Sequence, residues 1–158
     1  MTNKTSRNIK ICSYVALAFC VVWAVSDIAN FVAFIFGGNA SSHSIDWSQK
    51  TVLKVAILSC YVVGMVSIIG LCVKAIFNIS KGLRDNTAFP RSNERLLFWM
   101  ALADFIYVIG SCNLQVLWDD SILFLLQHTN FVTPFFLLFF AFMYKVAADA
   151  VEENNLTV

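Results

Sequence analysis

Charged residues are scarce in this chain. Asp, Glu, Lys and Arg make up 13% of its 158 residues, whereas apolar residues make up 59%. A soluble globular domain carries roughly 25% charged residues, so the composition excludes an ordinary soluble domain. The net charge of +1 gives no electrostatic reason to expect direct contact with nucleic acid.

Residues that usually carry chemistry are scarce as well. The chain has two histidines, and none of its five cysteines forms a C-x-x-C pair or another spacing typical of metal ligands. Candidate acids, bases and nucleophiles do not converge at one predicted depth. We therefore expect no catalytic residues, no metal and no cofactor, and we expect the protein not to be an enzyme.

Four long apolar stretches account for most of the sequence. A helix needs roughly 20 residues to cross a ~30 Å hydrocarbon core, and each stretch is long enough. The strands of a membrane barrel would alternate strictly over about 10 residues, and these stretches do not. We predict an all-α fold, a single domain (1–158) that forms an integral membrane four-helix antiparallel bundle. The predicted helices are Ile11–Phe36, Val52–Phe77, Leu96–Trp118 and Ile122–Ala148.

The charges in the short connections orient these helices. The connection between the first two helices contains Lys50 as its only Lys or Arg residue, and the connection between the last two is Asp119-Asp120. Basic residues precede the first helix and lie between the second and third, where they are Lys81, Arg84, Arg91 and Arg95. Basic connections favour the cytoplasmic side. We therefore predict a multi-pass plasma-membrane protein with both termini in the cytoplasm and the lipid bilayer as its main partner.

Asp27 is the most unexpected residue of the first predicted helix. A carboxylate inside a bilayer costs about 2.5–3.5 kcal/mol. Asn30 follows three residues later and shares a helix face with Asp27. One interpretation is an ion or proton site. The other, which we favour, is a carboxyl group that faces the bundle and is protonated or paired with a neighbour such as Lys54.

Lys74 and Asp104 form a second polar feature. Asp104 is expected about two turns into the third helix, and Lys74 about one turn inside the cytoplasmic end of the second. The depths are close enough for an interhelical ion pair. The alternative is that Lys74 extends to the lipid headgroups. Asp27 and Asp104 are expected at different depths, so no paired-carboxylate site is predicted.

Further polar residues lie near the predicted outer ends of the third and fourth helices. For these we expect interhelical hydrogen bonds, worth about 0.6 kcal/mol each. Pro134 is predicted to kink the fourth helix. The segment Phe135–Phe142 is predicted to face lipid, with a face for homo-oligomer formation as the alternative. The polar residues are Asn113, Gln115, Gln127, His128, Thr129 and Asn130.

The middle loop and the C-terminal tail carry two short motifs. The first has the pattern Gly…Phe-(Ser/Thr)-x-x-Asn-x-x-x-Leu and is represented by Gly82, Phe89, Asn93 and Leu97, with Pro90 at the hydroxyl position. The second, Glu-x-x-Leu-Thr-(Ile/Val), is represented by Glu153, Leu156, Thr157 and Val158. In these motifs, in length and in helix number, the chain resembles the bacterial membrane family named domain of unknown function 2975. The resemblance implies a bacterial cytoplasmic (inner) membrane location and no known activity.

Two functions remain to be separated. The first is a non-enzymatic regulatory or interaction role, in which the basic loop docks on the acidic tail formed by Asp149, Glu152 and Glu153. Members of the family it resembles are often encoded beside small helix-turn-helix regulators, which by analogy implies a cytoplasmic regulator protein as partner. The second is a small proton-coupled transporter or exporter that uses Asp27. Such transporters place the site near the midplane, and Asp27 is expected to lie off centre.

Overall fold

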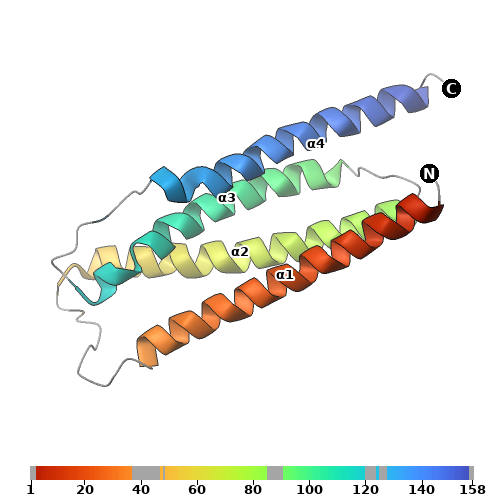
Figure 1. The fold of residues 1–158 in the computed structure, drawn as a ribbon. Helices are drawn as coiled ribbons and strands as arrows, with labels where there is room; N and C mark the ends of the chain where they lie inside the picture. Colours follow the sequence, from red (N-terminus) through yellow and green to blue (C-terminus); the bar gives the residue numbers. More distant parts are fainter. Residues whose placement is uncertain are drawn as a thin grey trace.

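The computed structural model describes residues 3–36, 47, 49–84, 91–119, 124 and 128–156. These residues contain four α-helices, two short 3-10 helices and no strand (Figure 1). The α-helices are α1 (Asn3–Phe36), α2 (Thr51–Arg84), α3 (Ser92–Cys112) and α4 (Val132–Leu156), and the 3-10 helices are η1 (Leu114–Leu117) and η2 (His128–Phe131).

Each α-helix contains a segment that is long and apolar enough to cross a bilayer. Such segments stay helical in lipid because a helix satisfies its backbone polar groups internally. For the described residues, the predicted all-α fold with four helices of membrane-spanning length is confirmed. The segments are Arg7–Ala33, Thr51–Gly82, Ser92–Cys112 and Val132–Glu153.

The helices follow one another in space as they do in sequence. α1 packs on α2, α2 on α3, and α3 on α4, whereas the described parts of α1 and α4 do not pack against each other. Consecutive helices run in opposite directions, so α1 begins and α4 ends at the same end of the molecule (Figure 1). The described helices therefore form an open row and not a closed ring.

Several buried positions carry alanine beside larger residues such as Tyr61 and Ile57, and many large apolar side chains lie on the outside. Ala24, Ala101 and Ala141 are buried, whereas Phe19 is 73% and Phe135 is 64% exposed. Small residues let helix backbones approach closely, and lipid removes the drive to bury large apolar side chains. The distribution therefore suits a hydrocarbon environment better than water.

Several predicted helix boundaries differ from the structure. α1 begins at Asn3, eight residues before the predicted start, α3 begins at Ser92, and α4 ends at Leu156, eight residues after the predicted end. α2 continues past Phe77 to Arg84. α3 ends at Cys112 and is followed by η1, so the predicted end at Trp118 is wrong. α4 begins at Val132, ten residues after the predicted start. Pro134 lies in the first turn of α4, where its missing N–H has no helical acceptor to lose. Pro134 thus belongs to the beginning of α4 and does not kink its interior.

Candidate functional site

α2 and α3 approach each other most closely at two glycines. Gly64 lies against the backbone of Tyr107, and Gly110 lies against the backbone of Tyr61. A Cβ atom at these glycines would lie 2.6 Å and 2.3 Å from the facing backbone atoms, closer than real Cβ contacts come. Glycine is therefore required at both positions for this approach. The two contacts bring the tyrosine rings side by side, with centroids 5.5 Å apart.

Asp27 of α1 lies where the two tyrosines meet. The Tyr61 hydroxyl donates a hydrogen bond to Asp27 Oδ2 at 2.7 Å, and the Tyr107 hydroxyl donates to the same oxygen at 2.9 Å. Trp23 and Phe31 lie one turn before and one turn after Asp27. Their rings pack on Tyr107 and Tyr61 at centroid distances of 5.5 Å and 4.9 Å. We call these five residues the Asp27 cluster.

Tyrosine hydroxyls, and not Lys54, are the partners of Asp27. In the described part of the chain no ion pair joins Asp27 to Lys54. Lys54 is fully buried and precedes Tyr61 by seven residues, which is about 10.5 Å along α2. Asn30 is exposed and lies outside the cluster. Asp27 thus faces the other helices, as one of the two interpretations expected.

The Asp27 cluster joins α1 to both α2 and α3. The membrane-spanning segment of α1 is the least buried of the four, so it has few packing contacts with the other helices. Hydrogen bonds between membrane helices contribute about 0.6 kcal/mol on average and up to about 1.7 kcal/mol. Two such bonds to one carboxyl oxygen make Asp27 the main polar anchor of α1 in the described residues.

The predicted ion pair between Lys74 and Asp104 is not formed. The glycine contacts set residue 64 opposite 107 and residue 61 opposite 110, so Lys74 lies opposite Leu97. Asp104 is seven residues further along α3, about 10.5 Å away along the axis. Lys74 is exposed, and among the described residues no ion pair joins it to Asp104. The exposed Lys74 fits the alternative of a side chain that extends outward.

Asp104 is buried without a complete set of partners. It is 9% exposed, and its Oδ2 atom makes no hydrogen bond. Because α3 begins at Ser92, Asp104 lies about 18 Å along the helix and not two turns from its start. A buried polar atom without a partner costs about 1–3 kcal/mol. The described contacts therefore give the Asp104 carboxyl group no stabilising role.

The basic loop and the acidic end of the chain are in contact at the end of the molecule where α3 begins. Arg91 precedes α3, and its Nη2 atom lies 3.0 Å from Asp149 Oδ1 and 2.6 Å from Glu152 Oε2, both on α4. The three side chains are largely exposed, at 64%, 44% and 54%. Of the expected docking, the structure shows the contacts of Arg91 with Asp149 and Glu152, which belong to α4, while residues 85–90 of the loop lie outside the described residues. We call this contact the Arg91 clasp.

Asn93 is a buried polar link just behind the Arg91 clasp. It is 2% exposed, and its side chain donates to the Ala75 carbonyl at 3.2 Å and accepts from Asn78 at 3.0 Å, both on α2. Tyr144 of α4 also hydrogen-bonds Asn93. This motif residue therefore holds the first turn of α3 against both neighbouring helices.

The other motif residues are scattered along this end of the molecule. Gly82 is buried in α2, Leu97 is half-buried in α3, and Glu153 is exposed on α4. Leu156 is the last residue of α4. Phe89, Thr157 and Val158 lie outside the described residues, so these parts of the motif prediction stay untested.

The polar residues at the opposite end make local and interhelical contacts. Asn113 is 2% exposed and donates to the Ile109 carbonyl at 2.9 Å, at the end of α3. Asn130 of η2 donates to the Cys112 sulfur of α3 at 2.8 Å. Gln115 is exposed, Gln127 lies outside the described residues, and His128 and Thr129 belong to η2. In the described ranges no three His, Cys, Asp or Glu residues are grouped closely enough to hold a metal ion.

The residues that build the Asp27 cluster carry a sequence signal that composition and periodicity did not reveal. Tyr61–Gly64 reads Tyr-Val-Val-Gly, and Tyr107–Gly110 reads Tyr-Val-Ile-Gly. The same four-residue pattern on two consecutive helices that run in opposite directions lets each glycine receive the other tyrosine.

Comparisons of this chain with models of protein families, with curated proteins and with solved structures find no match.

Proposed function

We propose that this chain is a multi-pass protein of the bacterial cytoplasmic membrane with a non-enzymatic regulatory or interaction role. In this proposal α1–α4 form an antiparallel bundle with both termini in the cytoplasm. The working surface is the cytoplasmic end, where the Arg91 clasp closes over Asn93. Its partner is a cytoplasmic regulator protein, in line with the resemblance to the family named domain of unknown function 2975.

The positions of the lysines support the proposed membrane placement. Lys54 and Lys74 are twenty residues apart on α2, which is about 30 Å and matches the hydrocarbon thickness. The register of α2 and α3 puts Arg95 close to the level of Lys74, and the Arg91 clasp puts Lys145 of α4 at the level of Arg95. Cations at one level on three helices suit the boundary with anionic headgroups.

The Arg91 clasp is the observation that carries the proposed role. Ion pairs between exposed side chains contribute about 0.2–1 kcal/mol each, so a charged partner surface can displace them at little cost. Their opening would separate the acidic end of α4 from the start of α3. The buried Asn93 behind the clasp couples that movement to α2, because it hydrogen-bonds residues of that helix.

The topology has a direct test. Alkaline phosphatase folds only outside the reducing cytosol, so a fusion at Ser42 should be active, and fusions at Asn86 and after Val158 should be inactive. Activity at Asn86 would overturn the orientation and with it the cytoplasmic working surface.

The regulatory role is tested by charge reversal of the Arg91 clasp. In a strain that lacks the gene for this protein, expression of the wild-type protein should restore the transcript profile of the parent strain, and expression of Arg91→Glu should not. Arg91→Glu combined with Asp149→Arg and Glu152→Arg should restore the profile, because the reversed charges attract again. Equal membrane levels of the three proteins serve as the control. Full restoration by Arg91→Glu alone would refute a role for the clasp.

The alternative function, a small proton-coupled transporter or exporter, rests on Asp27. A carboxyl group in hydrogen-bond contact with the hydroxyls of Tyr61 and Tyr107 has the groups needed to pass a proton. Asp27→Asn keeps the shape and the acceptor oxygen but cannot titrate. If Asp27 has only a structural role, cells that express the folded Asp27→Asn variant keep the phenotype of cells that express the wild-type protein. Loss of the phenotype in a well-folded Asp27→Asn protein would favour the transporter.

A further inference from the structure

A groove runs between α2 and α3 on a face to which α1 contributes no lining residue. Its walls are apolar or small, and they include Val63, Ser67, Gly70, Leu102 and Ile106. A Cβ atom placed on Gly70 would meet nothing within 4 Å, so the floor of the groove is open there. The groove is therefore wide enough beside α2 to take an alkyl chain.

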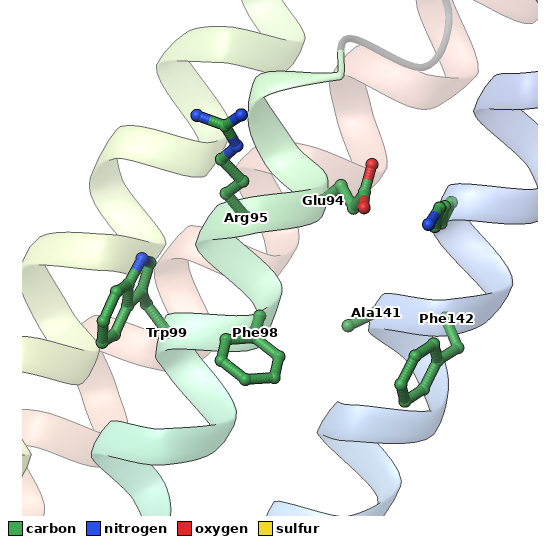
Figure 2. Close-up of a pocket in the computed structure, with 7 residues that line it drawn as sticks. Glu94, Arg95, Phe98, Trp99, Ala141 and Phe142 are labelled. Atoms are coloured by element: carbon green, nitrogen blue, oxygen red, sulfur yellow. The ribbon is translucent and has the colours of Figure 1, made fainter.

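A polar pocket continues from one end of this groove. Lys74 and Trp99 line both the groove and the pocket, so the two spaces meet at these residues. The pocket is also lined by Arg95 of α3 and Lys145 of α4. Figure 2 shows Arg95 and Trp99 on the side of α3 that faces α2, with Glu94 on the side toward α4. The end of the groove is thus bordered by an indole ring and three cations.

The three cations are not neutralised within the described chain. No ion pair joins Lys74, Arg95 or Lys145 to an acidic residue there, and all three side chains are exposed. Of the two acidic residues in the pocket, Asp149 is paired with Arg91, which leaves Glu94 as the acid beside the three cations. The pocket therefore has an excess of positive charge that suits a phosphate.

We propose that this composite site binds one anionic phospholipid. An acyl chain lies in the groove between α2 and α3, the phosphate lies among Lys74, Arg95 and Lys145, and Trp99 marks the boundary between them. The apolar groove explains why the ligand carries an acyl chain, and the unpaired cations explain why its headgroup is anionic. The proposal requires membrane insertion but not the regulatory role.

Binding of single lipids to the full-length protein tests the site. Native mass spectrometry of protein in a neutral detergent would give dissociation constants for phosphatidylglycerol and phosphatidylcholine of equal chain length. We expect phosphatidylglycerol to bind roughly tenfold more tightly, because Lys and Arg residues near a headgroup favour an anion. Glycerol 3-phosphate, which has the same phosphate chemistry without acyl chains, should bind far more weakly. Equal binding of the two lipids, or equally tight binding of glycerol 3-phosphate, would overturn the proposal.

Three variants locate the site. Lys74→Gln combined with Arg95→Gln should remove most of the preference for phosphatidylglycerol. Gly70→Leu should weaken both lipids, because its Cβ atom has open space and the rest of its side chain would occupy the groove. Lys81→Gln is the matched control, since Lys81 is an exposed lysine of α2 that does not line the pocket or the groove. Unchanged binding by Gly70→Leu, or an equal loss with Lys81→Gln, would place the lipid elsewhere and refute the site. Helix content and thermal unfolding confirm that each variant is folded.

Discussion

The close contact between α2 and α3 makes a quantitative prediction for Gly110→Ala. The new Cβ atom would lie 2.3 Å from the Tyr61 nitrogen and 2.7 Å from its Cα atom. An ordinary contact of about 3.4 Å requires the two helices to separate locally by about 1 Å. Because α1 packs on α2, a displacement of that size would take the Tyr107 hydroxyl of α3 from 2.9 Å to beyond hydrogen-bond range of Asp27. The substitution should therefore disturb packing and the Asp27 cluster together.

The expected loss has two parts. Overpacking of a closely fitted contact costs about 1–3 kcal/mol, and loss of an interhelical hydrogen bond costs about 0.6 kcal/mol on average. Gly110→Ala should lower the free energy of unfolding by about 1.6–3.6 kcal/mol. Gly70→Ala is the matched control because its Cβ atom meets nothing within 4 Å. The control should be neutral or stabilising by up to about 1 kcal/mol, since alanine favours the helix.

The measurement is reversible unfolding in mixed micelles, followed by tryptophan fluorescence. Tyr107→Phe adds a second readout. In the wild-type background it should cost the energy of the bond to Asp27, whereas in the Gly110→Ala background it should cost almost nothing, because that bond is already broken. If Gly110→Ala is as harmless as Gly70→Ala, the close approach of α2 and α3 and the geometry of the Asp27 cluster are both wrong.

The remaining predictions use the same unfolding assay. Asp104→Leu should raise stability by about 1–3 kcal/mol because it removes a buried oxygen without a partner; a loss instead would show that the carboxyl group has a stabilising partner. Lys74→Met should change stability by less than about 0.5 kcal/mol, and its effect should add to that of Asp104→Leu. If each single variant is less stable and the double variant recovers that loss, the result would instead support an ion pair between Lys74 and Asp104. Asn93→Ala should cost about 1–3 kcal/mol because it removes two hydrogen bonds from a buried side chain to half-buried groups on α2, and a neutral effect would remove Asn93 as a link. Arg91→Ala should cost less than about 1 kcal/mol, and the loss should shrink in high salt; an effect independent of salt would contradict an exposed ion pair.

The amino-acid sequence alone determined the four membrane-length helices of this protein. Apolar runs of more than twenty residues become helical wherever water is absent, because no other structure of a single segment satisfies the backbone. The docking of the basic loop on the acidic end also followed from charge, since Arg91 and Asp149 of opposite sign lie at the same end of consecutive helices. The helix ends were predicted less well. The apolar runs continue beyond Cys112 and begin before Val132, but the described segments there, Leu114–Leu117 and His128–Phe131, are 3-10 helices.

Only the tertiary structure decided which polar groups meet. Depth estimated from sequence allowed Lys74 either to pair with Asp104 or to extend to the headgroups, and the register of α2 and α3 separates the two residues by about two turns. That register is set where Gly64 and Gly110 admit the backbones of Tyr107 and Tyr61, and the same contact turns both tyrosine hydroxyls toward Asp27. The hydropathy of a segment depends on its own residues, so the sequence shows it directly. The partner of a buried carboxyl group depends on contacts between helices within a few ångströms, and those arise only when the helices pack.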